Sequence, residues 1–481
     1  MTIQPDIYLA IDQGGQSSRA SLYDHQGNCL AMASHPVTTT ILKPGWIEQE
    51  TQEVIASIKH VVNTVLNQGV IHPRANIKAG LATQRSSITC WDKLSSQPLS
   101  NIISWQDSRA AQWLTEQCFD PNEIHQISGL KLSPHFGASK LHWCLQHIQA
   151  VKQAQTDQRL SFGPMTAYLI HMLLLEHPHL IDTVNAARTQ CLDIQQLIWS
   201  DSLLQLFDLP QSALPQTVPT KYHFGHLAEY PAIPLTTVTG DQSAALYAFG
   251  KPEEDNIYIN IGTGAFVLQP TGTSCRYHEK LLTSLIRQDE HRAYYALEGT
   301  INGAGAALNW LASELQVTKD ELLSLLSDKE ENYATIPLFI NTISGLGSPF
   351  WQTALEPHFI GESSQYGKAR AVLESIIFLI MCNIEVLQNI KHSTQIIVTG
   401  GLSRLNPLCQ WLADLSKLNI IRPDVTEATS RGLAFQLAGM PEDWPDMIIN
   451  QQFLPRSNNQ LETRYLQWRN ALQSALDSVL T

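Results

Sequence analysis

The stretch that decides the fold is Ile7-Tyr-Leu-Ala-Ile-Asp-Gln-Gly-Gly-Gln-Ser-Ser-Arg-Ala-Ser-Leu-Tyr23. Its apolar ends, residues 7–11 and 19–23, predict two strands joined by a polar turn that contains two glycines. The same arrangement returns in Ile257-Tyr-Ile-Asn-Ile261, Gly262-Thr-Gly264 and Ala265-Phe-Val-Leu268, which are typical of a strand, a turn and a strand. One such unit near the start of each half predicts two similar α/β lobes that face each other.

The length and composition of the chain agree with two lobes. With 481 residues the chain is long enough for two or three domains, because a domain usually has about 100–200 residues. Since 43% of the residues are hydrophobic and 16% are charged, the chain can bury large cores and is neither disordered nor fibrous. The segment Lys251-Pro-Glu-Glu-Asp255 resembles a connector. We therefore expect an N-terminal lobe over residues 1–250 and a C-terminal lobe over residues 251–481.

The charge balance limits the partners and the compartment. The 31 basic and 44 acidic residues give a net charge of −13, so the chain lacks the basic surface of a nucleic-acid-binding protein and disfavours anionic membranes. Its eight cysteines form no C-x-x-C pair, which favours reduced thiols. Arg19 is the first basic residue, which argues against a signal peptide. The longest apolar runs, residues 168–175 and 376–382, are shorter than the ~18–20 residues of a membrane span. We expect a cytoplasmic protein without nucleic-acid or membrane partners, and a homodimer stays open.

Strands alternate with helices along the rest of the chain. Residues 396–398 are typical of a strand that ends in two glycines, and residues 407–415 of a helix. Apolar residues recur at helical spacing over residues 368–387, which predicts a buried helix. The last segment predicts a docked amphipathic helix, with one apolar face made of Leu461, Tyr465, Trp468, Leu472 and Leu476.

The first glycine turn has the features of a phosphate cradle. Backbone N–H groups in a tight turn of Gly14 and Gly15 can approach an anion closely. Ser17 and Ser18 add hydroxyl donors, and Arg19 adds positive charge. Asp12, at the end of the preceding strand, could orient a hydrated Mg²⁺ ion. The alternative is an ordinary hairpin turn with an aspartate. A dinucleotide fingerprint is excluded, because a strand follows the turn and G-x-G-x-x-G is not present.

Gly262-Thr-Gly264 is the second candidate turn. Alone it is only a sharp turn between strands. Opposite the first turn, it would complete a pair of amide-lined turns that hold a polyphosphate from both sides.

Asp241 is the candidate catalytic residue. Residues 236–239 predict a strand and residues 244–249 a helix, so Asp241 lies at a strand-to-helix turn. One interpretation is that Asp241 is simply a helix N-cap. The other is a carboxylate that accepts a hydroxyl proton while that oxygen attacks phosphorus.

Two further glycine pairs could lie against an adenine ring. They occur in Thr399-Gly-Gly-Leu-Ser403, followed by Asn406, and in Gly345-Leu-Gly-Ser-Pro349. A plain connection between strand and helix is the alternative for each.

A series of short motifs resembles one known family in content and order. The resemblance extends from about residue 7 to about residue 440, and the ordered set is highly specific although each motif is short. The chain is similar to the FGGY carbohydrate kinases, and within them to the glycerol kinases. The motifs are Asp12-Gln-Gly14, Lys43-Pro-Gly-Trp-Ile-Glu48, Gln84-Arg85, Trp105-Gln-Asp-Ser-Arg109, Asn185-Ala-Ala-Arg188, Gly240-Asp-Gln-Ser-Ala-Ala245, Gly262-Thr-Gly264, Leu297-Glu-Gly299, Gly345-Leu-Gly-Ser-Pro-Phe-Trp351, Leu373-Glu-Ser375, Gly400-Gly401 and Glu427 with Gly432.

The resemblance implies an α/β fold of two actin-like (ribonuclease H-type) lobes with a central ligand cleft. ATP and Mg²⁺ would bind mainly on the C-terminal lobe, and a small polyol or sugar mainly on the N-terminal lobe. The reaction would be transfer of the γ-phosphoryl group to a hydroxyl of that substrate.

The resemblance also implies a role for individual residues. Asp241 matches the catalytic base, and Asp12 and Asp241 match the carboxylates near the metal. The substrate contacts would be Arg85, Ser86, Trp105, His135, Asp241, Gln242 and Phe266. The nucleotide contacts would be Gly14, Gly15, Gln16, Ser17, Arg19, Gly262, Thr263, Gly264, Gly305, Gly400, Gly401 and Asn406.

Three departures from the glycerol kinase pattern affect the expected substrate. The usual Gly-Thr-Thr of the first turn is Gly14-Gly15-Gln16, the usual Gln-Arg-Glu is Gln84-Arg85-Ser86, and the usual Pro-Tyr is Pro134-His135. Each lost or exchanged polar partner costs about 1–3 kcal/mol, so the phosphate contact is weaker and glycerol itself is in doubt. Ser86 leaves room for a longer polyol or a ketose. The alternatives are a pentulose or ketose kinase of the same family, and a catalytically degenerate sugar- or nucleotide-binding sensor.

Overall fold

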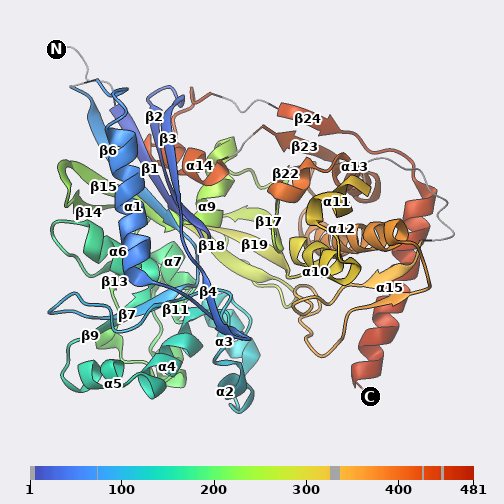
Figure 1. Ribbon diagram of the computed structural model, residues 1–481, viewed down its shortest axis with the longest axis horizontal. Coiled ribbons are helices and arrows are strands. Elements are labelled where there is room, and N and C mark those ends of the chain that lie inside the picture. The colour runs from blue at the N-terminus through green and yellow to red at the C-terminus, as the bar shows by residue number, and fades with distance from the viewer. Residues whose placement is uncertain (1–5, 73, 326–335, 425–426, 446–448, 481) are drawn as a thin grey trace.

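The chain folds into two lobes that lie side by side (Figure 1). The computed structural model describes residues 6–72, 74–325, 336–424, 427–445 and 449–480. In the view of Figure 1, the N-terminal half (blue to green) is on the left and the C-terminal half (yellow to red) is on the right. Each half is built around one large twisted sheet.

The sheet of the first half has six strands in the order β14-β15-β6-β1-β2-β3. Strands β1, β2 and β3 are antiparallel neighbours, whereas β6 runs parallel to β1 and β15 parallel to β6. Helix α1 (Thr51–Leu66) packs against β2 and β3, and its apolar residues lie in the core. The strands are β1 (Asp6–Gln13), β2 (Ser17–Asp24), β3 (Cys29–Pro36), β6 (Asn76–Thr83), β14 (Lys221–Leu227) and β15 (Tyr230–Gly240).

The sheet of the second half repeats this topology. Its seven strands have the order β18-β19-β17-β16-β22-β23-β24. The pairs β16–β17 and β17–β19 are antiparallel, and the pairs β16–β22 and β22–β23 are parallel. Both sheets thus contain the same five-strand core, with three antiparallel strands followed by two parallel ones, and the actin-like two-lobed fold is confirmed. The strands are β16 (Asn256–Ile261), β17 (Ala265–Gly272), β18 (Leu282–Gln288), β19 (Ala293–Ile301), β22 (Gln395–Thr399), β23 (Asn419–Pro423) and β24 (Ile449–Phe453).

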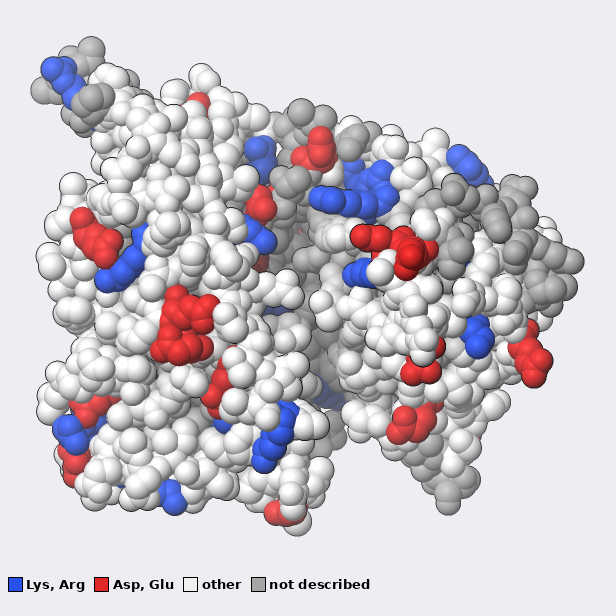
Figure 2. Space-filling view, in the orientation of Figure 1, with Lys and Arg blue, Asp and Glu red and all other residues white. Residues whose placement is uncertain are grey.

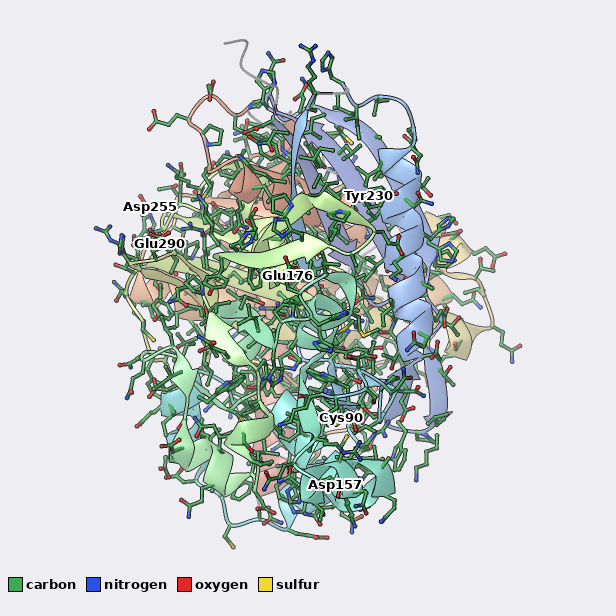
Figure 3. All side chains as sticks on the ribbon, turned by 90° about the vertical axis from the view of Figure 1, so that its left-hand side faces the viewer. Cys90, Asp157, Glu176, Tyr230, Asp255 and Glu290 are labelled. Carbon is green, nitrogen blue, oxygen red and sulfur yellow. The ribbon has the colours of Figure 1, made fainter. Side chains whose placement is uncertain are left out.

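A smaller sheet extends the first lobe. It has five strands in the order β4-β5-β8-β7-β9, and helices α4 (Gly137–His147) and α6 (Met165–Leu173) pack against β7 and β9. Figure 3 shows the outer side of this lobe, with α1 lying beside Tyr230, whose hydroxyl donates a hydrogen bond of 2.7 Å to Asn63 Oδ1. The strands are β4 (Thr40–Lys43), β5 (Trp46–Gln49), β7 (Ile88–Asp92), β8 (Ile102–Ile103) and β9 (Leu160–Pro164).

Short elements complete the first lobe. They are α2 (Ala111–Thr115), α3 (Pro121–Ser128), α5 (Gln149–Thr156), β10 (Leu180–Asp182), α7 (Thr183–Ala187), β11 (Leu192–Asp193), β12 (Ile198–Trp199), α8 (Asp201–Leu206) and β13 (Gln216–Val218).

Helix α12 (Gln365–Ile390) is the central helix of the second lobe. By length and composition it could cross a membrane, but 83% of its most apolar window is buried inside the protein, where it packs against β17, β19, α10 and α13. The expected buried helix over residues 368–387 is therefore a core helix. The remaining elements of this lobe are α10 (Gly305–Leu315), α11 (Lys319–Leu325), β20 (Leu338–Ile340), β21 (His358–Ile360), α13 (Asn406–Ser416) and the docked C-terminal helix α15 (Asn459–Leu480).

Two helices join the lobes at their centre. Helix α9 (Asp241–Leu246) follows β15 of the first lobe, and α14 (Ala428–Leu437), which follows β23 of the second, packs on α9 and on β1 and β6. The crossing is close, because a Cβ atom at Gly432 would lie 1.9 Å from the carbonyl oxygen of Ala244. A glycine is therefore required at this point of contact.

Candidate active site

The lobes face each other across a deep furrow, which Figure 2 shows running between the two halves with basic and acidic side chains on its walls. Strand β15 ends at this junction, and α9 begins there. Gln242 on α9 accepts a hydrogen bond of 3.2 Å from Asn260 Nδ2 on β16 of the other lobe. The start of α9 is thus in direct contact with the second lobe.

Asp241 is the first residue of α9, and Gly240 occupies the N-cap position without a side-chain cap. The interpretation of Asp241 as the N-cap is therefore wrong. Its Oδ1 accepts a hydrogen bond of 2.7 Å from the backbone N–H of Gln242 and lies 3.9 Å from Nε of Arg85. The side chain is 26% exposed, and its burial raises the pKa above the ordinary aspartate value. Asp241 is thus a partly open carboxylate that can accept a proton at the junction of the lobes.

A buried ion cluster adjoins Asp241. Glu298, on β19 of the second lobe, is completely buried and lies 3.4 Å from Nη1 of Arg85 and 3.3 Å from Nη2 of Arg188, both on the first lobe. Ser284 donates a hydrogen bond of 2.6 Å to the same carboxylate. Burial alone would raise the pKa of Glu298, but Arg188 and Arg85 outweigh it and lower the pKa to about 2. Glu298 therefore stays ionised and links the lobes.

Neither Glu298 nor Arg188 was expected at the site from residue chemistry. Both lie in the quoted motifs Leu297-Glu-Gly299 and Asn185-Ala-Ala-Arg188. A charged residue inside the otherwise uncharged strand β19 was the available signal, because a buried charge requires a partner.

Asp12 forms a second charged group across the furrow. It is 3% exposed and lies 3.4 Å from Nη1 of Arg19, whose Nε lies 3.6 Å from Oε2 of Glu427 near the start of α14. Burial, with the negative charges of Asp241 and Glu427, raises the pKa of Asp12 to about 7. Asp12, Asp241 and Glu427 thus place three carboxylates in one region, and Arg19 opposes their effect by lowering the pKa of Asp12.

The first glycine turn is hydrogen-bonded to residues on the substrate side of the lobe. The carbonyl of Gly15 accepts hydrogen bonds from Gln49 Nε2 at 2.8 Å and Thr39 Oγ1 at 3.0 Å, and Gln49 Oε1 accepts one from Gln84 at 2.7 Å. Gln16 is exposed and Ser17 half-buried.

The Ser18 hydroxyl, expected as a phosphate donor, is instead fully buried and 2.8 Å from Ser57 Oγ on α1. Ser18 therefore anchors α1.

Residues expected to contact the substrate come together from both lobes. Phe266 on β17 lies 6.0 Å from the guanidinium carbon of Arg85. Trp105 is half-buried. Its carbonyl oxygen lies 3.3 Å from Nδ1 of His135, whose side chain is exposed. Ser86 has a φ of 66°, in the left-handed region, directly after Arg85. Arg85, Asp241, Gln242 and Phe266 thus form one group.

The second glycine turn is packed against the start of α10. The backbone N–H of Gly305 donates a hydrogen bond of 3.0 Å to the carbonyl of Gly262, and that of Ala306 donates one of 2.9 Å to Thr263. A Cβ atom at Gly305 would lie 2.6 Å from Gly262 O, and one at Gly264 would lie 2.8 Å from Ile301 O. Gly262 and Thr263 are exposed, so this turn is free to meet a ligand.

The third glycine pair lies after β22. Gly400 has a φ of 89°, and a Cβ atom there would lie 2.5 Å from Ile261 O, so the strand can end here only with glycine. A Cβ atom at Gly401 would meet no atom within 4 Å. Asn406 is exposed, and its Oδ1 accepts a hydrogen bond of 2.9 Å from Arg422. The pair thus borders open space beside the second turn.

Among the residues that the structure describes, no three His, Cys, Asp or Glu side chains are arranged to hold a metal ion by themselves.

Comparison with known proteins places this geometry in a family. The models of the FGGY family of carbohydrate kinases match residues 7–248 with the N-terminal domain and residues 257–440 with the C-terminal domain. A glycerol kinase from Natranaerobius thermophilus is 32% identical, over 97% of this chain and 98% of its own length.

Solved structures agree in fold. The Plasmodium falciparum glycerol kinase with ADP has a TM-score of 0.86 and 25% identity, over 98% of this chain and 99% of that one. A ligand-bound xylulose kinase from Lactobacillus acidophilus has a TM-score of 0.83 at 18% identity, over 98% of this chain and 100% of that one. The two matched family models together cover most of the sequence, and the chain therefore belongs to the FGGY family of carbohydrate kinases.

Proposed function

We propose that the protein transfers the γ-phosphoryl group of ATP to a hydroxyl of a small polyol or sugar, with Asp241 as the general base. The observation that carries this proposal is the partly open Asp241 carboxylate at the junction of the lobes, next to the guanidinium of Arg85. Phosphoryl transfer requires little covalent chemistry from the protein. Positioning of the reactants and stabilisation of charge therefore account for most of the rate enhancement. A furrow that closes between two lobes provides both and excludes water.

The residues around Asp241 have different roles in binding and activating the substrate. Arg85 donates hydrogen bonds to its hydroxyls while Glu298 and Asp241 hold the guanidinium in place. Trp105 and Phe266 pack against the carbon skeleton from opposite lobes. Asp241 accepts the proton of the attacking hydroxyl, and burial favours this step because it makes the carboxylate a stronger base.

The charges around Asp12 fit a divalent cation. Its carboxylate is buried, and Asp241 and Glu427 add negative charge beside it, which Arg19 offsets in part. We propose that Asp12 and Asp241 hold Mg²⁺ through water, and that the ion neutralises phosphate charge when bound. The nucleotide would be held by the first turn (Gly14, Gly15, Gln16 and Ser17, with Arg19), the second turn with Gly305 at the N-terminus of α10, and Gly400, Gly401 and Asn406 beside the adenine.

We infer that the substrate has three to five carbons. Ser86 and His135 provide small or neutral polar groups next to Arg85 and Trp105. The glycerol kinase relative and the xylulose kinase of similar fold mark the two ends of this range. We also propose a lobe boundary between residues 250 and 251 and a cytoplasmic location.

A coupled assay of ADP release tests the function. The protein is incubated with ATP and Mg²⁺ and a panel of glycerol, erythritol, xylulose and ribulose. We expect one or more of these compounds to stimulate ADP release well above the rate with no acceptor. Release that is equally fast without an acceptor identifies an ATPase. A compound that raises the melting temperature but stimulates no ADP release identifies a binding protein, and either result contradicts the proposal.

A further inference from the structure

Two loops of the first lobe carry the proposed substrate contacts. Residues 84–87 follow β6 and include Arg85, and residues 104–107 follow β8 and include Trp105. The backbone N–H of Trp105 donates a hydrogen bond of 3.0 Å to Ser87 Oγ, so the loops are in contact. Strand pairing of Ile88 with Ile103 brings the loops together at one end, but residues 84–87 and 104–107 themselves lie outside the strands, where side chains connect them.

Lys140 on α4 supplies the second link between these loops. Its side chain has no exposed surface, and Nζ donates hydrogen bonds of 3.0 Å to the carbonyl of Ser86 and 2.9 Å to the carbonyl of Ser104. Each acceptor lies directly next to a proposed substrate contact, Ser86 after Arg85 and Ser104 before Trp105. A single amine therefore joins both loops where they enter the site.

The backbone at Ser86 explains why a link is needed. A φ of 66° is uncommon for a residue other than glycine, so the peptide after Arg85 needs an external partner to hold it. The bond from Lys140 to the carbonyl of Ser86 is that partner. It fixes the direction in which the loop leaves Arg85.

A packing role alone does not account for Lys140. Burial of an amine is costly, and an apolar side chain of similar length would fill the same space at lower cost. Burial lowers the pKa of Lys140 to about 7, and a neutral amine still carries the two N–H donors that the two carbonyls require. The negative charge of Asp107, which is completely buried, favours the protonated form of Lys140 and raises its pKa, but the burial of Lys140 has the larger effect.

We propose that Lys140 is a positioning residue of the kinase reaction, which fixes the distance between the Arg85 loop and the Trp105 loop and so sets the affinity for the substrate. This role rests on the proposed function. Lys140 does not touch the nucleotide side of the furrow, where the second turn and α10 lie. Its effect is therefore confined to the acceptor.

The variant Lys140→Met tests this role, with Lys152→Met on the exposed face of α5 as the matched control. For the panel compound that the wild type turns over fastest, we expect KM to rise at least ~10-fold, while KM for ATP changes less than about 2-fold. The melting temperature should fall by only a few degrees, because two buried carbonyls lose their donor while the cost of the buried amine is removed. The control variant Lys152→Met should leave the KM for the panel compound, the KM for ATP and the melting temperature unchanged.

Hydrogen–deuterium exchange of the ligand-free protein gives a readout that does not require turnover. We expect Lys140→Met to increase deuterium uptake in peptides that cover residues 84–88 and 104–108, and to leave the second lobe unchanged. If the wild type turns over no panel compound, the proposed function fails, and the exchange result still decides whether Lys140 links the loops. Should Lys140→Met not fold, Lys140→Gln is measured in the same way.

Unchanged KM and unchanged exchange in these loops would overturn the proposal. A parallel loss of affinity for both substrates with a much lower melting temperature would overturn it as well, because it would assign Lys140 a general role in stability.

Discussion

Three carboxylates of one furrow show how burial and neighbours set the chemistry of a residue. Asp12 lies near the acids Asp241 and Glu427, and Asp241 lies near Arg85 and Arg188, yet burial raises the pKa of both. Glu298 is completely buried, but Arg188 and Arg85 outweigh its burial and lower its pKa to about 2. The first two can bind a cation or accept a proton, whereas Glu298 remains a fixed negative charge.

The variant Asp241→Asn removes the proposed base and nearly preserves the shape of the side chain. We expect kcat to fall by at least ~10²-fold, because a positioned general base contributes about 10²–10⁴-fold to the rate. The affinity for ADP should change little, since the proposed nucleotide contacts lie mainly on the second lobe. Steady-state kinetics and calorimetric titration with ADP measure the two effects.

Asp208→Asn is the matched control for this variant. Asp208 is exposed and has a φ of 52°, a conformation that asparagine also accepts. The activity of the Asp208→Asn variant should equal that of the wild type. Undiminished turnover of Asp241→Asn would remove Asp241 from the mechanism.

At the scale of elements, the position of Asp241 depends on how two helices cross. Helix α9 begins at Asp241, and α14 packs on it through Gly432. Ala244 and Leu433 belong to an apolar cluster that includes Tyr8 of the first lobe and Tyr258 of the second. The helix that carries the proposed base is thus held by both lobes.

The variant Gly432→Ala should separate these helices. Its Cβ atom would lie 1.9 Å from Ala244 O and 2.8 Å from the backbone nitrogen of Ala248, and backbone atoms cannot yield as a side chain can. We expect a loss of about 2 kcal/mol in the free energy of unfolding. We also expect kcat to fall ~10-fold, because Asp241 moves with α9. Urea unfolding and steady-state kinetics measure both.

Gly401→Ala is the control for stability, since a Cβ atom there meets nothing within 4 Å. It should unfold at the same urea concentration as the wild type. Equal stability of Gly432→Ala and the wild type would show that the helices tolerate a wider separation.

At the scale of the whole molecule, buried charges connect the lobes across the furrow. Glu298 of the second lobe lies between Arg85 and Arg188 of the first, and Arg19 contacts Glu427. Removing one partner of a buried ion pair leaves the others unpaired and costs more than the pair itself contributes.

The variant Glu298→Gln should therefore destabilise the protein by about 3 kcal/mol at neutral pH. The folded pKa of about 2 lies below the ordinary glutamate value, so the stabilisation by Glu298 is present above pH ~4.5 and is lost as the pH falls towards 2. The difference in melting temperature between wild type and variant should be largest at pH 7 and shrink at pH 3, as calorimetry can measure. The exposed Glu290, labelled in Figure 3, gives the matched control Glu290→Gln, which should have no effect at either pH. A difference that stays constant from pH 7 to pH 3 would contradict the assigned ionisation of Glu298.

The local pattern of the sequence was sufficient for the two glycine-turn hairpins and the long core helix. The hairpins around Gly14 and around Gly262-Thr-Gly264 correctly predicted β1–β2 and β16–β17, because an apolar strand next to a glycine turn is a short-range signal. The periodicity over residues 368–387 predicted α12, and only its ends differ. Strand order was not available from these patterns, since pairing joins residues far apart in the chain.

The sequence by itself determined two glycine-turn lobes and an aspartate at the turn between β15 and α9, because turns, strands and a helix start are specified by neighbouring residues. Only the tertiary structure decided that Gly240 and not Asp241 caps α9, that Ser18 bonds to α1, and that Glu298 lies between two arginines of the other lobe. The physical reason is burial. The pKa and the partners of a charged group depend on which distant side chains exclude water from it, and no local pattern contains that information.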